Sequence, residues 1–200
     1  MIDRRWIVAV TGASGAPYAL HLLRALVDLR VGADVIVSEH GWRLFALETG
    51  VTGQEDLLQS IGGAGDLRFF DNENRGARPA SGSVPYKGLV ICPCSTATLS
   101  AIAHGSSRSL VERAADVTLK ERRKLVAVVR ETPLSAIHLE NMLDLARLGA
   151  VIMPASPGFY HDPRGIGDLI DFVVARVLDH MDVVHDVGYR WTGEEESVGG

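Results

Sequence analysis

The chain has 200 residues, of which 46% are hydrophobic and 22% are charged, so it can bury a core without disulfides or a structural metal. Its formal net charge of −5 argues against a nucleic-acid-binding surface, and it has no run of about 18 apolar residues that could span a membrane. We expect no signal peptide, because the first residues lead directly into an apolar run. The two cysteines are too few for a disulfide framework or a four-ligand zinc site. This composition indicates a cytoplasmic α/β protein.

The first forty residues have the pattern of a β-α-β unit. Residues 6–10 form a short apolar run that is typical of a buried parallel strand. The following segment carries apolar residues at helical spacing, with Ser14 as its expected N-cap, Pro17 in its first turn and Gly32 at its end. Residues 33–37 predict a second strand, which a right-handed crossover joins to the first.

The same alternation continues along the chain. Further strands are predicted at residues 88–92, 125–129 and 151–153, and further helices at residues 42–47, 55–61, 95–104, 110–119, 135–148 and 169–178. The segment 62–83 is rich in Gly, Asn, Arg and Ser and predicts no regular element. The alternation indicates one domain over residues 1–191, built on a parallel sheet with helices on both faces. Residues 192–200 are acidic and glycine-rich, and we expect them to be disordered.

Ligands of open α/β sheets bind beyond the carboxyl ends of the strands. Five segments are expected there: residues 11–15, 38–39, 93–98, 130–132 and 154–160. Four of them place hydroxyl or glycine residues at a strand-to-helix turn, where backbone N–H groups bind phosphate, and Arg130 adds a cation. Taken singly, each turn fits an ordinary helix cap equally well, and Glu48 fits a surface residue of a helix. The residues therefore predict a phosphate-bearing ligand but no reaction.

Longer motifs at these turns are more specific than the turns themselves. In chain order they are TGASGA at 11–16, SGS at 81–83, CPCS at 92–95, ERAAD at 112–116, LKERR at 119–123, RETP at 130–133, HL at 138–139, GAVIMPA at 149–155 and PGFYH at 157–161. With these motifs the sequence resembles the UbiX-type flavin prenyltransferases, a family also described as aromatic-acid decarboxylases. The resemblance covers nearly the whole chain, in order and with few gaps.

The resemblance implies a Rossmann-like, flavodoxin-type fold that binds FMN and uses reduced FMN as a substrate. It implies transfer of a dimethylallyl group from dimethylallyl phosphate to the flavin, with a new ring built across N5 and C6 and no metal. The prenylated FMN would then serve a separate UbiD-type decarboxylase. The family forms large homo-oligomers, commonly dodecamers, with pockets at subunit boundaries. Two alternatives use the same fold: an FMN-binding accessory subunit of a decarboxylase without its own catalysis, and a decarboxylase of the peptidyl-cysteine type.

The family pattern assigns site residues position by position. The flavin would be held by Gly12, Ala13, Ser14, Ser38, Ser95, Thr96, Ala97, Thr98 and Arg130. The phosphate of the prenyl donor would be held by Tyr160, Arg176, Lys120 and Arg113. The catalytic groups would be Ser14, Glu48, Arg113, Lys120 and Glu131. In an oligomer, Glu48 or Arg113 would complete a neighbour's site.

These assignments fit the chemistry of the implied reaction. Breaking an allylic C–O bond separates positive charge from phosphate, and cationic side chains stabilise the departing anion. Glu131 would take the proton that is lost as the ring forms. Val84 stands where relatives are expected to carry an aromatic ring, which weakens one wall against the allyl cation. Trp191 matches a late tryptophan of the family and would close the pocket in its place.

Overall fold

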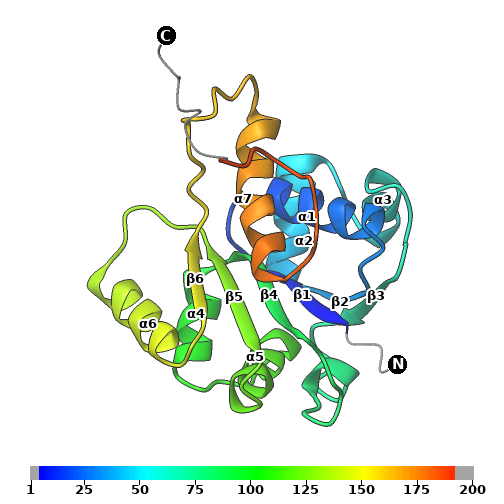
Figure 1. The fold of residues 1–200 in the computed structure, drawn as a ribbon. Coiled ribbons are helices and arrows are strands. Elements are labelled where there is room, and N and C mark those ends of the chain that lie inside the picture. Colours follow the sequence, from blue (N-terminus) through cyan, green and yellow to red (C-terminus); the bar gives the residue numbers. More distant parts are fainter. Residues whose placement is uncertain (1–4, 192–200) are drawn as a thin grey trace.

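A computed structural model describes residues 5–191, so the expected tail at 192–200 lies outside the described residues. Its centre is a parallel six-stranded sheet in the order β3-β2-β1-β4-β5-β6 (Figure 1). The strands are β1 (Trp6–Val10), β2 (Ala33–Val37), β3 (Leu67–Asp71), β4 (Gly88–Cys94), β5 (Lys124–Val129) and β6 (Val151–Pro154). The helices are α1 (Ala16–Asp28), α2 (Glu39–Thr49), α3 (Gln54–Ser60), α4 (Thr96–Ala103), α5 (Leu110–Lys120), α6 (Ala136–Arg147) and α7 (Ile166–His180), with a short 3-10 turn, η1 (Arg78–Ala80).

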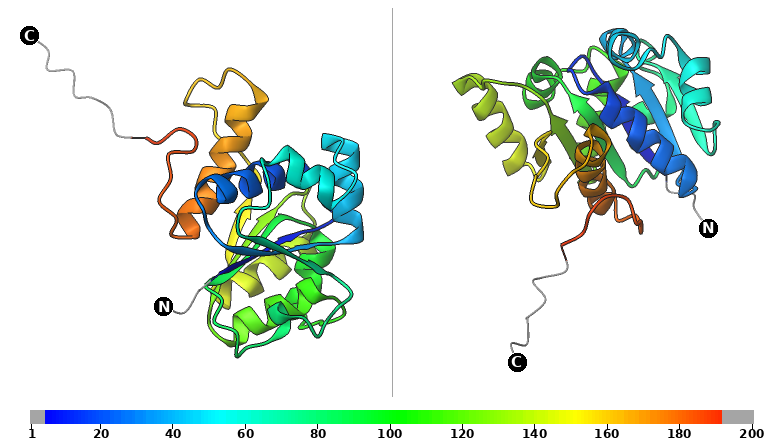
Figure 2. Two further views of the ribbon diagram at one scale, coloured as in Figure 1. Left: turned by 90° about the vertical axis from the view of Figure 1, so that its right-hand side faces the viewer. Right: turned by 90° about the horizontal axis from the view of Figure 1, so that it is seen from above.

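Helices cover both faces of the sheet (Figure 2). α1, α2, α3 and α7 pack on one face, where Leu22, Leu26 and Val174 belong to a common buried cluster. α4, α5 and α6 pack on the other, where Leu99 and Leu145 belong to a second cluster. The predicted α/β domain with a parallel sheet and helices on both faces is therefore confirmed. Among the helices of residues 5–191, none is both long and apolar enough to cross a membrane.

The structure differs from the sequence prediction mainly at three places, besides α2 and α7, which are longer than the predicted helices at 42–47 and 169–178. β3 lies inside the segment 62–83, for which no element was predicted, and pairs along β2 from Ala33 to Val37. β4 continues past the predicted end to Cys94. The N-cap of α1 is Gly15, not Ser14, because the chain turns there with a φ of 124° that favours glycine.

A buried cluster of charged residues stabilises the sheet at the amino-terminal ends of its strands. Asp34 on β2 is fully buried, and Arg5 donates to its carboxylate from Nε at 2.6 Å. Arg5 also donates to the Asp66 carboxylate at 2.6 Å and to the Ala33 carbonyl at 2.8 Å, and the Tyr86 hydroxyl donates to Asp34. The cluster therefore joins the segments that lead into β1, β3 and β4 through one guanidinium and one carboxylate.

Candidate active site

A cleft of about 430 Å³ lies at the carboxyl ends of the strands, where the strand order reverses between β1 and β4. This is the place where open α/β sheets bind their ligands. The cleft contains most of the flavin-binding positions expected from the sequence, together with one catalytic position. These lining residues are Gly12, Ala13, Ser38, Ser95, Thr96, Ala97, Thr98, Arg130 and Glu131. The chain thus brings residues from four different strand ends into one site.

Three helices present their N-termini to this cleft. The hydroxyls of Ser38, Ser95 and Ser109 accept hydrogen bonds from the first turns of α2, α4 and α5, at 3.0, 3.2 and 3.3 Å. Each N-terminus carries partial positive charge and N–H groups without helical partners. Arg130, at the end of β5, adds a full positive charge to the same cleft. The arrangement favours an anionic group such as one phosphate.

Thr11 holds the two strands together where the cleft opens between them. Its backbone N–H and its hydroxyl both donate to the carbonyl of Pro93, at 3.2 and 3.0 Å. The same hydroxyl accepts a hydrogen bond from the backbone N–H of Ser95 at 2.9 Å. Thr11 is buried, so these contacts are shielded from water and fix the first turn of the site against the N-cap of α4.

The turn between β1 and α1 is held from two sides. Arg130 donates from Nε to the Ser14 carbonyl at 3.0 Å. One carboxylate oxygen of Glu48, which projects from the far end of α2, accepts from the backbone N–H groups of Gly15 and Ala16, both at 2.8 Å. This carboxylate caps α1 in place of the predicted Ser14 cap. The close approach also requires glycine at position 12, because a Cβ there would lie 2.6 Å from the Cβ of His40.

Glu48 is ionised more readily than an ordinary glutamate. Burial acts to raise the pKa of Glu48, but hydrogen bonds from Ser14, Gly15 and Ala16, together with the charge of Arg130, outweigh it and lower the pKa. A carboxylate with a lowered pKa in the folded state stabilises the fold above its ordinary pKa. That contribution is lost as the pH falls through the lowered value.

Glu48→Gln is therefore expected to reduce the free energy of unfolding at pH 7 by roughly 1 kcal/mol, because the amide oxygen can still accept the two N–H groups and only the extra strength of the charged hydrogen bonds is lost. The loss should shrink as the pH falls through the lowered pKa of Glu48, because the wild-type side chain then becomes neutral as well. Urea unfolding at a series of pH values measures both effects. Glu140→Gln, which removes an exposed carboxylate on α6, serves as the control. An equal loss at pH 7 and pH 3 would contradict this role of the Glu48 charge.

Six of the expected residues do not line the cleft of the single chain: Ser14 and Glu48, which belong to the turn between β1 and α1 and its cap, and the four residues assigned to the donor phosphate. Lys120 is the last residue of α5 and lies near the start of β5, at the end of the sheet opposite to the cleft. Its side chain pairs with Glu121. Arg113 pairs with Asp116 at 2.7 Å on α5. Tyr160 is 60% exposed in the loop after β6, and Arg176 pairs with Asp179 at 2.9 Å on α7. One chain therefore does not bring all the residues assigned to the donor phosphate into one pocket.

The cleft also contains six residues to which no role was assigned from the sequence. Glu39 and Glu112 lie in segments named from the sequence, whereas His40, Asn72, Glu73 and Ser109 were not predicted. Asn72 follows β3 and positions α5, because its carbonyl and side-chain oxygen accept from the backbone N–H groups of Leu110 and Val111 at 2.7 and 3.2 Å. The position of Asn72 in the cleft could not be predicted from the sequence, because β3 itself was not predicted. Ser109 could have been found from the sequence, because a serine directly before an apolar helical pattern with Glu112 three residues later is an N-cap signal.

The residues of the cleft fit FMN. The three helix N-termini and Arg130 suit a single phosphate, and the open turn around Gly12 lets a ligand approach the backbone closely. A dinucleotide with a pyrophosphate requires the pattern G-x-G-x-x-G at this turn. Gly12 could be the first glycine of that pattern, but Ser14 and Pro17 stand at the second and third glycine positions. The donor set is thus that of a mononucleotide site.

Comparison with known proteins identifies the family. A model of the Flavoprotein family matches residues 1–178. The flavin prenyltransferase UbiX of Pseudomonas aeruginosa is 48% identical over 202 residues, which cover 97% of this chain and 96% of that protein. The chain belongs to the UbiX family of flavin prenyltransferases. This confirms the resemblance inferred from the motifs.

Solved structures of UbiX proteins share the fold. AnUbiX, solved in complex with FMN and dimethylallyl pyrophosphate, superposes with a TM-score of 0.89 at 40% identity, over 96% of this chain and 100% of that one. A dodecameric FMN-dependent UbiX-like decarboxylase from Escherichia coli superposes with a TM-score of 0.88 at 40% identity, over 94% and 100% of the two chains. The flavodoxin-type architecture expected from the resemblance is therefore confirmed.

Proposed function

We propose that this chain transfers a dimethylallyl group from dimethylallyl phosphate to N5 and C6 of reduced FMN. The observation that carries the proposal is the cleft itself, in which three helix N-termini and Arg130 surround an anion site with the Glu131 carboxylate beside it. Two findings support the choice of ligands: the family to which the chain belongs, and the presence of FMN and dimethylallyl pyrophosphate in the related AnUbiX structure. The product would be prenylated FMN.

The flavin, when bound, supplies the N5 and C6 atoms that form the new bonds to carbon. The groups of this chain manage charge and protons around it. The allylic C–O bond breaks as the phosphate leaves, and cationic side chains near the leaving group stabilise the negative charge that it carries away. The second bond would form as the alkene of the attached group takes up a proton at one carbon and bonds through the other to C6, which gives up its own proton. The Glu131 carboxylate is the base that accepts this C6 proton. Glu48 and Arg130 hold the turn that places Ser14 against the flavin.

Arg130→Ala is expected to weaken FMN binding by roughly 1.5–3 kcal/mol, the scale of a hydrogen bond to a charged group. Two contacts are lost together, because the guanidinium also holds the Ser14 carbonyl. Titration of the protein with FMN, followed by quenching of flavin fluorescence, measures the change. Arg147→Ala serves as the control, since its exposed pair with Asp144 lies on α6. A wild-type FMN dissociation constant for Arg130→Ala would remove Arg130 from the flavin site.

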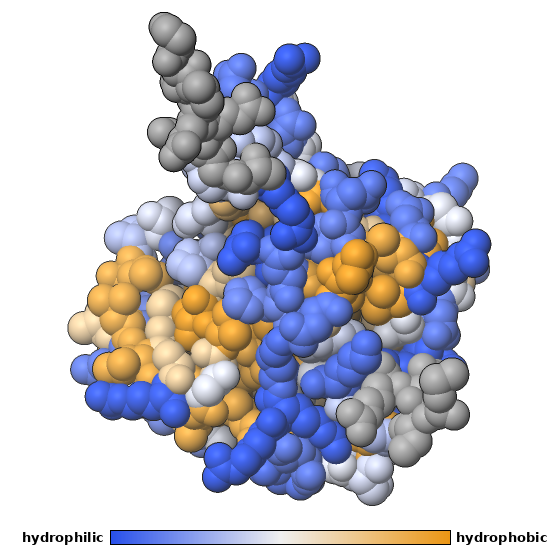
Figure 3. Space-filling view, viewed as in Figure 1, coloured by the Kyte–Doolittle hydropathy of each residue, from blue (hydrophilic) through white to orange (hydrophobic). Residues whose placement is uncertain are grey.

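We propose further that a second copy of the chain supplies Arg113 and Lys120 to the donor phosphate. The proposal is supported by their position outside the cleft of their own chain and by the dodecameric relative. An apolar surface suited to such an assembly covers α6 and the edge strand β6 (Figure 3). Its most exposed members are Ile137, Leu139, Leu143 and Leu148. Glu48 is bonded to the turn of its own chain, which favours a role there and not in a neighbour's site.

Subunit mixing tests the shared site. Glu131→Gln and Lys120→Ala are each expected to be inactive as homo-oligomers. Mixed under conditions of subunit exchange, they should regain activity, because some sites then combine an intact Glu131 from one chain with an intact Lys120 from another. Light scattering of each sample establishes that it is oligomeric. Recovery that fails in confirmed mixed oligomers, or a fully active wild-type monomer, would contradict the shared site.

If the chain were instead an accessory subunit of a decarboxylase, it would bind FMN and leave the flavin chemically unchanged.

We propose further that a UbiD-type decarboxylase receives the product and that the protein is cytoplasmic. Both parts of the proposal rest on the sequence. The recipient is testable directly: product made by this chain should activate a purified apo-decarboxylase of that type, whereas untreated FMN should not. Activation by FMN alone would contradict the recipient.

A further inference from the structure

Residues 183–191, which we call the strap, follow α7 and run back along it toward the loop after β6 (Figure 1). The strap begins with a hydrogen bond from the Val183 N–H to the Leu178 carbonyl at 3.1 Å. Its path passes very close to the helix, since a Cβ on Gly188 would lie 2.9 Å from the Asp171 carbonyl oxygen. Gly188 also has a φ of 69°, which favours glycine. The strap is thus fitted to α7.

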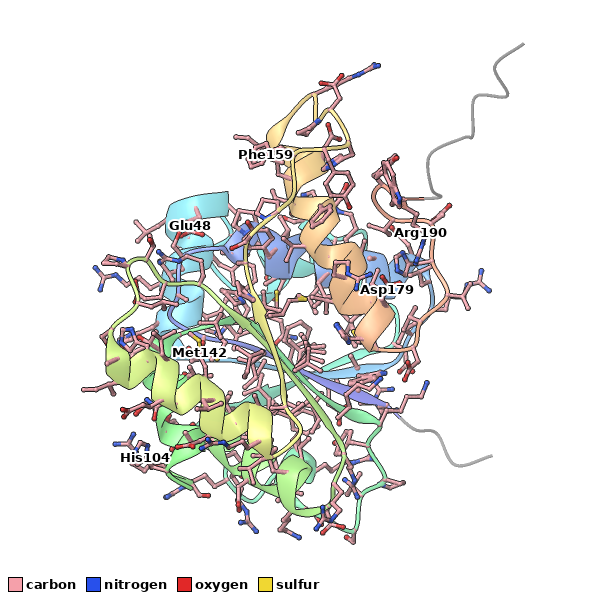
Figure 4. All side chains as sticks on the ribbon, turned by 60° about the vertical axis from the view of Figure 1, so that its left-hand side comes forward. Glu48, His104, Met142, Phe159, Asp179 and Arg190 are labelled. Atoms are coloured by element: carbon pink, nitrogen blue, oxygen red, sulfur yellow. The ribbon has the colours of Figure 1, made fainter. Side chains whose placement is uncertain are left out.

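The middle of the strap is fastened to Asp179 near the end of α7. The buried His185 ring lies with Nε2 3.2 Å from one carboxylate oxygen of Asp179, and Arg190 donates to the same oxygen at 2.6 Å. Figure 4 shows Asp179 and Arg190 side by side. The other carboxylate oxygen accepts from Arg176 at 2.9 Å. One carboxylate therefore joins the strap to an arginine that is assigned to the donor phosphate.

The end of the strap joins an aromatic cluster around Tyr160. The His161 ring is stacked between Phe172 of α7 and Tyr189 of the strap, with centroid distances of 5.5 and 5.6 Å and interplanar angles of 10° and 15°. Tyr160 meets Phe172, Tyr189 and Trp191 edge-on at 5.9 to 6.0 Å. Edge-on and stacked rings at these distances attract one another.

Both ring nitrogens of His161 are buried and have no hydrogen-bond partner among residues 5–191. Stacking between two rings is therefore what holds this imidazole in place. Loss of the Tyr189 ring would therefore remove one of the two stacking partners of His161 and one of the edge-on contacts of Tyr160, and so loosen both rings.

The residues that contact the strap and the residues assigned to the donor lie along one face of α7. Phe172 and Arg176 are four residues apart, so their side chains leave the helix on one side. Tyr160 packs on Phe172, while Arg176 is held by Asp179 one turn further along. We infer that the strap is a positioning element that orients Tyr160 and Arg176 together for the phosphate of the prenyl donor. This inference rests on the proposed assignment of those two residues to the donor.

The test compares variants of the strap in the full-length protein. Tyr189→Leu removes the ring that stacks on His161, and Arg190→Gln breaks the contact with Asp179 without touching Arg176. Both are expected to raise the KM for dimethylallyl phosphate by roughly three- to tenfold, the scale of one lost aromatic pair or charged contact. The FMN dissociation constant and kcat should stay within about twofold of wild type, because the strap does not line the flavin cleft.

Two control variants in the strap separate positioning from general damage. Tyr189→Phe keeps the stacked ring, so its KM for dimethylallyl phosphate should equal that of the wild type. Val184→Ala changes a side chain that is 95% exposed and should leave all constants unchanged. Wild-type KM values in both Tyr189→Leu and Arg190→Gln would overturn the inference, as would equal losses of FMN and donor affinity.

Tyr160→Phe and Arg176→Ala, measured in the same series, keep the inference separable from the proposed function. If these two raise the donor KM and the strap variants do not, the donor site stands and the strap inference alone fails. If these two leave the donor KM unchanged, the assignment of the donor site fails and the strap inference fails with it.

Discussion

Glu131→Gln is expected to lower kcat for prenylated FMN formation by about 10²–10⁴-fold, the usual contribution of a positioned general base. Glu131 follows Arg130 just after the carboxyl end of β5 and lines the cleft. Glutamine has nearly the same volume, so FMN binding should be retained. The amide cannot accept the proton that ring formation releases, and the reaction should stop after the first bond to the flavin.

Single-turnover reactions with reduced FMN, quenched and analysed by both mass spectrometry and visible spectroscopy, distinguish the two stages. The mass shows that the five-carbon group is attached, and the spectrum shows whether the ring has closed, because the two flavins have equal mass. The variant should accumulate a flavin that carries the five-carbon group, while its spectrum differs from that of the finished ring. Glu55→Gln, which removes an exposed carboxylate on α3, is the control for the change of net charge. Wild-type turnover of Glu131→Gln would refute its role as the base.

Asp34→Asn is expected to lower the free energy of unfolding by about 3–5 kcal/mol, because it removes the fully buried carboxylate that pairs with the Arg5 guanidinium. Arg5 and Asp34 have exposed fractions of 2% and 0%, so water cannot replace the lost carboxylate. The Tyr86 hydroxyl loses its charged acceptor at the same time. FMN binding at temperatures well below the melting point should be unaffected. The cluster lies at the amino-terminal ends of the strands, whereas the cleft lies at their carboxyl ends.

Asp144→Asn provides the matched control. It breaks an exposed pair with Arg147, whose side chain is 68% exposed, and should change the free energy of unfolding by less than about 1 kcal/mol. Urea denaturation of both variants at pH 7 measures the difference. Equal, small losses in the two variants would show that the buried cluster does not stabilise the sheet.

The sequence predicts the central sheet well because its inner strands are nearly continuous apolar runs. β1 and β2 are buried along their whole length, and Asp34, which Arg5 pairs, is the one charged residue in them. β3 is an edge strand in which Leu67 alone is fully buried, and its Arg68 and Asp71 interrupt the apolar pattern. An edge strand of this kind has no strong signal of its own, and it forms because β2 offers a free edge.

The site is predictable as far as it is built from strand ends. Turn residues such as Gly12 and Ser95 follow predicted strands, so the topology rule places them together. Asn72 was missed with β3. The role of Glu48 as the cap of α1 was missed because the contact joins residues more than thirty positions apart in the chain. Lys120 is a candidate only through the resemblance, since nothing in one chain brings it to the cleft.

The central claim is that this chain alkylates reduced FMN. The direct measurement is to incubate the purified protein anaerobically with reduced FMN and dimethylallyl phosphate, and then to determine the mass of the flavin and the phosphate released. We expect a flavin heavier by one five-carbon unit, an altered visible spectrum and one phosphate released for each flavin modified. Bound FMN of unchanged mass and spectrum, with no phosphate released, would contradict it and support a flavin-binding subunit without catalysis.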